Sequence, residues 1–497
     1  LGNLEEIFNP FAHAFISDVS NRYGSVIKIN GFLGDIQLLV SDTKALTHVL
    51  VKDGAFWESD DFTVALGAVT FGPGFFGTIG APHQRQRKQF MPVFTAANLR
   101  TFFPTFEQLT LMFQDRLRGL IARDGSATKV DIMPYATRLS LELIGVIAFG
   151  HSFDAAADGG KDEYSESLAR VFPTVSKMQR WAPLLPIFRK LFSPEFCRRL
   201  VEMSPFKPIH EYKNIVDTVH RNSVDIMQRA KALALSSSNA HGEDKNATSA
   251  LRQVIEANAK RDDSDRSSDA ELYAQINSIL FAGTEAGAVT VARILLTLAE
   301  NPKVQETLRR ELSEAGQLDH DKLMALPYLD AIYKETMRLY PPVWVTYRQA
   351  YTDCVLPLGR PVLRTDGIEV DNVFVPKNTV CLVNIVGANR DPLTWGADAQ
   401  DWRPERWLSP LPDSVAKAQV PSLYANTLSF AAGTRGCIGH KFAHIATKTV
   451  IAHLVSEFSF TITDRRILWK SGTIVSPCID PAGPPSLPLL VTRVEKE

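Results

Sequence analysis

The most informative part of the sequence is Phe430-Ala431-Ala432-Gly433-Thr434-Arg435-Gly436-Cys437-Ile438-Gly439. It combines a large aromatic residue, several glycines, one arginine and one cysteine, and an apolar pattern of helical period follows over residues 440–456. Glycines let backbone N–H groups turn toward a sulfur atom, and the N-terminus of the following helix stabilises negative charge there. The pattern therefore predicts a thiolate site at Cys437; an inert buried cysteine in a glycine turn is the alternative.

Other residues of this stretch suit a bound cofactor. Arg435 can meet an acidic group of the cofactor through a bidentate contact, and the ring of Phe430 can shield the sulfur from water. The remaining cysteines are scattered, with no CxxC pair and no zinc-type spacing, so we expect no disulfide framework. They are Cys197, Cys354, Cys381 and Cys478.

Composition describes a folded chain without a strong charge. Of its 497 residues, 45% are hydrophobic and 22% charged, which is ordinary for a globular protein with a large core. The 54 basic and 55 acidic side chains give a net charge of -1, so no global field attracts nucleic acid, and we expect no nucleic-acid partner. The length allows two or three average domains or one large α-rich enzyme domain.

The chain is predicted to be mostly helical with a small β region. Two β-type runs, residues 25–30 and 36–41, predict a hairpin, and strand character returns at 362–375 and 379–385. Residues 162–235 predict two helices joined by an apolar connection, interpreted as core packing or, alternatively, as a membrane-dipping or substrate-gating loop. The connection contains Trp181, Leu184, Leu185, Phe188, Leu191 and Phe192.

One long central helix is predicted over residues 268–300. Ser268-Asp269-Ala270-Glu271 has the form of a capping box, and Asn301-Pro302 ends the pattern. Its roughly 33 residues would extend about 50 Å, enough to cross a whole domain. Because its apolar part contains Glu285 and Arg293, which lipid would disfavour, we expect a buried helix and not a membrane span.

A pair of opposite charges precedes the cysteine stretch. Glu335 and Arg338 are spaced i, i+3, on one helix face, as are Glu306 and Arg309 elsewhere. Only the first pair lies in an apolar segment, residues 331–340, followed by Asp401-Trp402-Arg403-Pro404-Glu405-Arg406-Trp407. Further on, Lys441, His444 and Lys448 share one face of the helix after the cysteine. We expect that face to be solvated, or alternatively to dock an acidic partner protein.

These stretches, in this order, resemble the cytochrome P450 family. The cysteine stretch fits the FxxGxRxCxG haem-binding signature at Phe430, Gly433, Arg435, Cys437 and Gly439, a match expected by chance about once in ten thousand such chains. Glu335, Arg338 and Arg406 resemble the ExxR helix and PER segment. The resemblance implies that these three form a buried charge triad, which locks the loop that holds Cys437.

The resemblance implies a mainly α fold with small β-sheets, an α-rich triangular prism forming a single catalytic domain over residues 1–497. Haem b is expected between the long helix and the cysteine loop, with Cys437 as its iron ligand. His83 falls where the family usually has a tryptophan. Together with Arg87 and Arg348 it is expected to contact the haem propionates.

The long helix departs from the family pattern at one position. Ala282, Gly283 and Glu285 match the AGx(D/E)T segment, which makes Glu285 a proton-relay candidate or, alternatively, a structural carboxylate. Ala286 stands where most members carry a threonine hydroxyl that takes part in oxygen activation. A substrate hydroxyl could replace it, or water held by Thr284 or Thr290; otherwise the enzyme performs redox-neutral or peroxide-using chemistry.

The resemblance implies a monooxygenase, most similar to basidiomycete microsomal members, that oxidises a terpenoid, steroid-like or xenobiotic compound with O2. Electrons are expected from NADPH through NADPH-cytochrome P450 reductase. We expect a monomer at the cytoplasmic face of the endoplasmic reticulum membrane, attached by an N-terminal anchor absent from this sequence. A non-catalytic haem binder or sensor is a third possibility. The expected substrate-pocket residues are Phe281, Ala282, Val345, Thr346 and Ile474, beside Ala286.

Overall fold

A computed structural model describes residues 2–7, 9–31, 34–122, 125–153, 163–178, 181, 184–237, 250–262 and 265–494. Helices predominate and the sheets are small, as predicted. The described chain divides into two compact units. The first comprises Leu1–Glu58, Thr110–Ala136 and Ala286–Glu497, and the second comprises Ser59–Leu109 and Thr137–Glu285. The prediction of one catalytic domain over residues 1–497 stays a prediction.

A five-stranded sheet in the order β1-β2-β8-β5-β3 organises one end of the first unit. The predicted hairpin is present as the antiparallel pair β1 (Val26–Asn30) and β2 (Ile36–Val40). β2 pairs in parallel with β8 (Val380–Asn384), which pairs antiparallel with β5 (Val345–Ala350). The short β3 (Trp57–Glu58) closes the edge. Val40, Cys381 and Val383 are buried in an apolar cluster on this sheet, which fixes β5 and its Arg348 in place.

Three smaller sheets complete the β structure of this unit. β10 (Leu468–Ser471) and β11 (Val475–Cys478) form an antiparallel hairpin. β12 (Pro488–Arg493) pairs with both β4 (Thr128–Asp131) and β9 (Phe458–Ile462). The run predicted as strand over 362–375 is in fact the end of β6 (Cys354–Leu363) and all of β7 (Glu369–Val375), because a turn at Gly367 (φ 83°) separates them.

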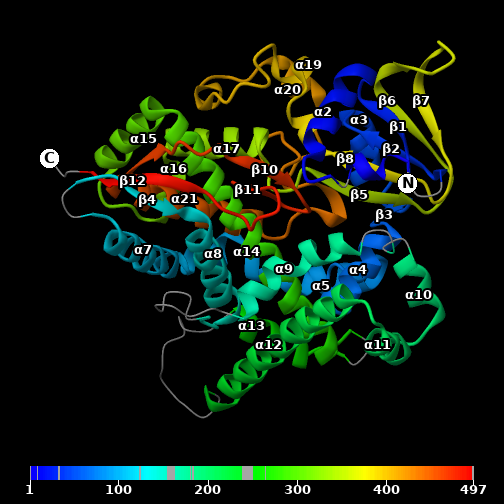
Figure 1. The fold of residues 1–497 in the computed structure, drawn as a ribbon, viewed down its shortest axis with the longest axis horizontal. Helices are drawn as coiled ribbons and strands as arrows, with labels where there is room; N and C mark the ends of the chain where they lie inside the picture. Colours follow the sequence, from blue (N-terminus) through cyan, green and yellow to red (C-terminus); the bar gives the residue numbers. More distant parts are fainter. Residues whose placement is uncertain are drawn as a thin grey trace. The chain divides into compact units, whose positions relative to one another are not determined.

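Helices of the first unit pack against its sheets, including strands β1 and β6 (Figure 1). The longest, α21 (His440–Glu457), is the helix predicted after Cys437. The others are α1 (Leu4–Ile7), α2 (Ala12–Tyr23), α3 (Thr43–Thr47), η2 (His48–Lys52), α15 (Pro302–Ala315), α16 (His320–Ala325), α17 (Pro327–Leu339), α18 (Ile385–Asn389), α19 (Pro392–Trp395), η6 (Pro404–Leu408), α20 (Asp413–Ala418) and η7 (Gly433–Arg435).

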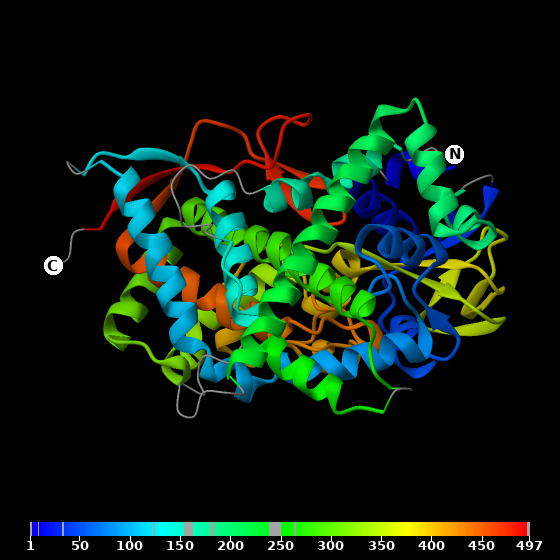
Figure 2. The ribbon, with the colours of Figure 1, turned by 90° about the horizontal axis from the view of Figure 1, so that it is seen from below.

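The second unit is helical in the residues described. Its longest helix, α12 (Lys207–Ser237), packs along α9 (Glu163–Lys177) (Figure 2). The other helices are α4 (Asp61–Phe71), α5 (Gly80–Phe90), η3 (Met91–Phe94), α6 (Ala96–Thr101), α10 (Leu185–Leu191), α11 (Pro194–Met203) and α13 (Ala250–Ala259). Helices α7 (Phe103–Leu120), α8 (Ile132–Phe149) and α14 (Asp269–Glu300) contribute residues to both units.

The predicted long helix is α14, and the predicted capping box is formed. The Ser268 N–H donates to the Glu271 carboxylate at 2.9 Å, and the Glu271 N–H donates to Ser268 Oγ at 3.3 Å. By length and composition both α14 and α8 could cross a membrane, yet 67% and 72% of their most apolar windows are buried inside the protein. Core helices have this character, in agreement with the sequence interpretation of α14.

The prediction for residues 162–235 was wrong in two respects. Four helices, α9 to α12, occupy the described part of this region instead of two. The apolar connection is not core packing, because Leu191 is 69% exposed and Trp181 65%. Their neighbours Phe188, Phe192, Phe196 and Met203 are exposed as well. Apolar composition alone predicts core packing here, but helices α10 and α11 expose these side chains at the surface.

Candidate functional site

The cysteine stretch forms a tight loop that ends at the N-terminus of α21. The Cys437 N–H donates to the Phe430 carbonyl at 2.9 Å, and the Gly436 N–H donates to the Gly433 carbonyl at 3.0 Å. Phe430 is buried, whereas the Cys437 side chain is exposed. Gly439 is the N-cap residue of α21, so Cys437 lies two residues before it, next to the positive end of the helix.

The shape of this loop depends on a glycine. Gly433 has a φ of 67°, in the left-handed region, and a Cβ atom there would overlap the carbonyl oxygen of Leu50 in η2. Ala431 also adopts a positive φ, 54°, which costs an L-residue free energy that the surrounding contacts must offset. The backbone between Phe430 and Cys437 is thus held in one conformation by its packing.

The side chain of Cys437 is suited to be the single protein ligand of a metal ion. All five cysteines are described, and none forms a disulfide; Cys437 alone among them is exposed. Among the described residues, no three His, Cys, Asp or Glu side chains gather as a metal site would require. One exposed thiol beside a helix N-terminus therefore fits a metal that brings its other ligands with it, as iron does in a porphyrin.

Arg435 contacts a carboxylate of the protein. Its Nε lies 2.6 Å from Glu58 Oε1, in β3, and its side chain is only 9% exposed. The sequence prediction for Arg435 was a contact with an acidic group of a cofactor. That contact stays a prediction, and Glu58 was missed because 377 residues separate the two partners.

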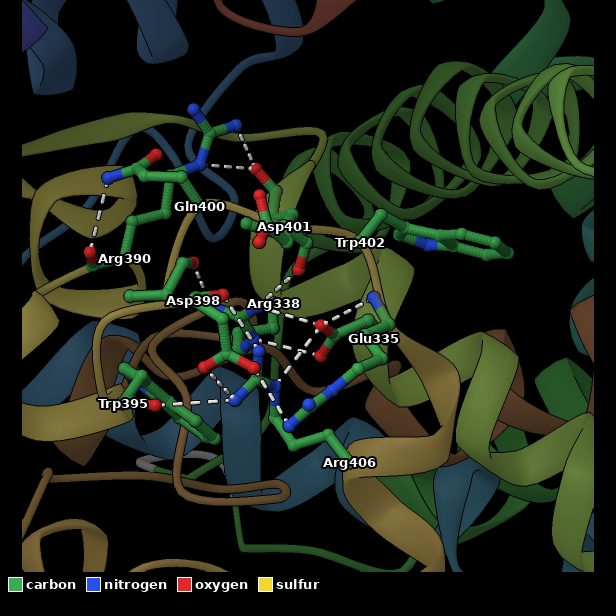
Figure 3. Close-up of polar contacts among 12 residues, drawn as sticks. Glu335, Arg338, Arg390, Trp395, Asp398, Gln400, Asp401, Trp402 and Arg406 are labelled. Atoms are coloured by element: carbon green, nitrogen blue, oxygen red, sulfur yellow. Dashed lines mark hydrogen bonds and ion pairs between the residues drawn. The ribbon is translucent and has the colours of Figure 1, made fainter.

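The three predicted charges meet in the protein interior (Figure 3). Arg338 donates to Glu335 through Nε at 2.9 Å and through Nη2 at 2.8 Å, and both side chains have no exposed surface. Arg406 Nε lies 3.3 Å from the same carboxylate and is 3% exposed. Although burial alone would raise the pKa of Glu335, the hydrogen bonds and charge of Arg338 hold it below its usual value.

Further partners satisfy the remaining atoms of this cluster. The indole of Trp407 donates to Glu335 at 2.9 Å, and Asp398 accepts from Arg406 at 2.9 Å. Arg338 also donates to the carbonyls of Ala399 at 2.7 Å and Asn389 at 3.1 Å. Sequence reasoning missed Asp398 and Asn389, which belong to no recognised spacing. A buried charge cluster satisfied on every side is rigid, and expensive to break.

A chain of hydrogen bonds connects this cluster to the cysteine stretch. Asn389, whose carbonyl accepts from Arg338, uses its side chain to accept from the Leu428 N–H at 2.8 Å and to donate to Ser429 at 3.0 Å. Ser429 Oγ in turn donates to the Met337 carbonyl at 2.7 Å, in α17. Ser429 directly precedes Phe430. Through these hydrogen bonds, the charge cluster holds the N-terminal end of the cysteine stretch in place.

The basic face predicted on α21 is solvated only in part, because Lys441 is exposed whereas His444 and Lys448 contact a carboxylate. Lys448 is fully buried and lies 2.9 Å from Asp330, while His444 lies 3.1 Å from the same carboxylate. Lys334 pairs with Asp330 at 2.6 Å, and Tyr424 Oη lies 3.4 Å away. Burial raises the pKa of Asp330, but these hydrogen bonds and charges outweigh it and keep the pKa low. The prediction was wrong for His444 and Lys448, because helical periodicity cannot show that α17 places the acidic residue Asp330 against them.

Helix α14 carries the residues predicted for oxygen chemistry. Burial raises the pKa of Glu285 to about 7, so this carboxyl titrates near neutrality. The Thr284 hydroxyl donates to the Leu280 carbonyl at 2.6 Å, and the Thr290 hydroxyl donates to the Ala286 carbonyl at 2.8 Å. Both hydroxyls therefore hydrogen-bond to the backbone four residues earlier, and Thr290 Oγ1 also lies 4.0 Å from Met337 Sδ.

The predicted propionate contacts come from two elements. His83, buried, and Arg87, partly buried, lie on α5 in the second unit. Arg348, also buried, lies on β5 in the first unit and donates to the Tyr347 carbonyl at 2.7 Å. The propionate role of all three stays a prediction.

The predicted substrate-pocket residues are likewise divided between the two units. In the first, Val345 and Thr346 begin β5, and Ile474 lies in the turn between β10 and β11. In the second, Phe281 is buried against Phe71, with ring centroids 4.8 Å apart, and Ala282 is exposed. Their role in substrate binding stays a prediction.

Comparisons with known proteins agree with this geometry. The family model for cytochrome P450 matches residues 1–475. The chain is 35% identical to cytochrome P450 monooxygenase 91 of Postia placenta, over 99% of the chain and 92% of the relative. It is 37% identical to cytochrome P450 monooxygenase 81 of the same fungus, over 96% and 88%. It is also 35% identical to a ganoderic acid synthetase of Ganoderma lucidum, over 97% and 89%.

The chain therefore belongs to the cytochrome P450 family. It is an oxidoreductase whose relatives are named monooxygenases, and membership of the family implies haem. The sequence prediction of the family, including its likeness to basidiomycete members, is confirmed.

We predict that Glu335→Gln strongly destabilises the protein. The substitution leaves Arg338 buried without its carboxylate partner, at a cost of about 3 to 5 kcal/mol, while Arg406 keeps its ion pair with Asp398. Glu306→Gln is the matched control, because Glu306 pairs with Arg309 at the same spacing but is 70% exposed. Glu306→Gln should lower the free energy of unfolding by only about a few tenths of a kcal/mol. Urea unfolding followed by circular dichroism measures both, and equal losses would contradict a special role for Glu335.

We also predict that Glu285 makes stability depend on pH. Its pKa, raised to about 7 in the folded protein, exceeds that of the unfolded chain. The folded state is therefore most favoured below the unfolded pKa, and stability is lost as pH rises through about 7. Glu285→Gln should remove this loss, which is at most about 3 kcal/mol. Urea unfolding between acidic and alkaline pH tests this, with exposed Glu314→Gln as the control that keeps the wild-type profile.

Proposed function

We propose that this chain is a haem-thiolate monooxygenase that inserts one oxygen atom of O2 into an apolar small molecule. The observation that carries the proposal is Cys437, exposed at the N-terminus of α21 in a loop held by the buried charges of Glu335, Arg338 and Arg406. Bound haem b would supply the oxidising chemistry, and thiolate ligation favours cleavage of the O–O bond.

The proposed roles follow from residue chemistry. Cys437 is the iron ligand, and the helix N-terminus stabilises its negative charge. Phe430 limits access of water to the sulfur, Gly433 allows the left-handed turn before the cysteine, and Gly439 is the N-cap of the following helix. Arg435, His83, Arg87 and Arg348 are the proposed partners of the haem propionates. The charge triad is structural and keeps the cysteine loop in place.

Proton delivery is proposed to use Glu285. Ala286 has no hydroxyl, and the hydroxyls of Thr284 and Thr290 already donate to backbone carbonyls. A carboxyl with a pKa of about 7 is protonated often enough at neutral pH to act as a donor. We propose that Glu285 delivers protons together with a hydroxyl of the substrate, which takes the place of the missing threonine.

The substrate class is proposed from the predicted wall residues. Val345, Ile474 and Phe281 have apolar side chains, and Ala282 and Ala286 have small ones. These features favour a large apolar compound of the terpenoid, steroid-like or xenobiotic type. The similarity to a ganoderic acid synthetase supports a role in fungal secondary metabolism.

We propose that the protein works as a monomer at the cytoplasmic face of the endoplasmic reticulum membrane, and receives electrons from NADPH-cytochrome P450 reductase. The exposed apolar side chains of α10 and α11 support contact with lipid, and Arg189, Lys190, Arg198 and Arg199 lie among them. Flotation with phospholipid vesicles tests this contact, and a protein that stays at the bottom of the gradient would argue against it.

The spectrum of the reduced protein with carbon monoxide tests the proposed ligand. We expect the long-wavelength Soret band of thiolate ligation in the wild type and its loss in Cys437→Ala, because alanine offers no sulfur to iron. Cys197→Ser is the control, since Cys197 lies on α11 outside the cysteine loop. Retention of the thiolate band in Cys437→Ala would refute the assignment.

A second candidate function rests on Ala286. An enzyme without the threonine hydroxyl could perform redox-neutral or peroxide-using chemistry, such as isomerisation, dehydration or peroxygenation. The monooxygenase requires reductase, NADPH and O2 for product formation, whereas the alternatives do not. Ala286→Thr should increase the fraction of NADPH oxidation coupled to product, because it restores a proton-donating group. Product formation without reductase, and unaffected by Ala286→Thr, would favour the alternatives.

A further inference from the structure

Four side chains from four elements form a stack in the first unit. The guanidinium carbon of Arg293, on α14, lies 3.1 Å from the ring centroid of Trp469 on β10 and 4.2 Å from that of Tyr340. Arg390, which follows α18, lies 5.3 Å from the Tyr340 ring. Cations and aromatic rings thus alternate in the order Arg390, Tyr340, Arg293, Trp469, and we call this arrangement the cation–π stack.

Two aromatic rings and the charge of Glu300 offset the charge of Arg293. Its Nε is buried and, among the described residues, has no hydrogen-bond acceptor. Burial, together with the charge of Arg390, lowers the pKa of Arg293 to about 9, so the group is still cationic at neutral pH. A cation removed from water interacts more strongly with an aromatic face than an exposed one does. Arg293 and Trp469 therefore hold their elements firmly together.

The stack joins the reaction helix to the hairpin that carries a predicted pocket residue. Arg293 lies seven residues after Ala286 on α14, two helical turns away, and hence on the same face. Trp469 lies on β10, and Ile474 occupies the turn between β10 and β11. One guanidinium thus connects the face of α14 that carries Ala286 to the hairpin of Ile474.

The rest of the hairpin is anchored by hydrogen bonds to other parts of the unit. The Trp344 indole donates to the Gly472 carbonyl at 2.8 Å, and the Val475 N–H donates to the Pro342 carbonyl at 2.8 Å. The Ser471 N–H donates to the Pro10 carbonyl at 2.6 Å. These anchors lie on both sides of Ile474 but connect the hairpin to the segments that precede β5 and α2. Contact with α14 comes from Arg293 and Trp469.

At the other end, the stack is fixed to the helix of the charge triad. Tyr340 is the C-cap residue of α17, the helix of Glu335 and Arg338. Arg390 donates through Nε to the Leu339 carbonyl at 2.8 Å, next to Tyr340, and its own carbonyl accepts from Gln400 (Figure 3). Tyr340 therefore cannot shift without disturbing α17. The cation–π stack therefore connects the hairpin to α17, whose position is fixed by the charge triad.

We propose that Arg293 and Trp469 are positioning residues for substrate specificity, which hold the β10–β11 hairpin against α14 and so set how far Ile474 stands from Ala286. This proposal rests on the proposed function, because it treats Ile474 and Ala286 as walls of the substrate pocket. Loosening the stack should change which large ligands fit, while small ligands of the iron are unaffected.

The test compares two azole ligands of different size in the haem-loaded protein. Imidazole is small, whereas 4-phenylimidazole carries a ring that extends toward the pocket wall; both shift the Soret band when they bind iron. Arg293→Met and Trp469→Leu should change the Kd of 4-phenylimidazole by about 3- to 30-fold, the range expected for loss of a desolvated cation–π contact. The Kd of imidazole should stay at the wild-type value.

Hydrogen exchange supplies a measure independent of ligand binding. Amide exchange over residues 468–478 should accelerate about tenfold in both variants, because the hairpin loses a cooperative anchor. Trp469→Phe keeps an aromatic face and should lie nearer to the wild type than Trp469→Leu. Arg310→Met, at an exposed position on α15, is the control and should leave exchange and both affinities unchanged.

The outcomes separate this proposal from the proposed function. If neither azole shifts the Soret band of the wild type, the haem-thiolate assignment fails. If both azoles bind but Arg293→Met and Trp469→Leu keep wild-type affinities and wild-type exchange over 468–478, the positioning role is refuted. If Trp469→Leu does not fold, Arg293→Met decides: faster hairpin exchange than in the wild type supports the proposal, and wild-type exchange refutes it.

Discussion

A carboxylate without contact with water has to be neutralised and hydrogen-bonded by its neighbours, and the carboxylate of Glu335 places that demand on its surroundings. Two arginines, an indole and a backbone N–H meet it. The same arginines then bind carbonyls of the segments after α18 and before η6, so those segments have defined positions. Asn389 accepts from Arg338 and donates to Ser429, the residue before Phe430, so the cluster also fixes the start of the cysteine stretch. These hydrogen bonds therefore hold the loop that carries the exposed thiol of Cys437.

Sequence reasoning succeeded where the signal was local. The spacing of Glu335 and Arg338, the capping box at Ser268 and the pattern around Cys437 each lie within ten residues, and the described structure contains all three arrangements. Contacts between distant residues carried no such signal. Glu58 is far from Arg435 in sequence, and Asp330 is far from Lys448. For that reason the sequence predicts that His444 and Lys448 are solvated, whereas they contact Asp330 on α17.

Helix α14 combines two departures from an ordinary core helix. Near its middle, Ala286 removes a hydroxyl that the family usually has, and the nearby threonine hydroxyls are engaged with the backbone. Toward its end, Arg293 introduces a largely buried cation that stacks on two aromatic rings. Neither feature improves the packing of the helix itself. Both become intelligible if the helix serves a reaction: the first alters how protons arrive, and the second fixes what surrounds the substrate.

Helices α10 and α11 give the protein a property that matters at the bench. Their apolar side chains face outward with arginine and lysine residues between them, so a preparation in plain buffer exposes an adhesive area to other copies. Apparent mass in solution will then report how much detergent is present as well as any true assembly. Serine replacements at Leu191 and Met203 offer a route to well-behaved, crystallisable material that leaves the cysteine loop untouched.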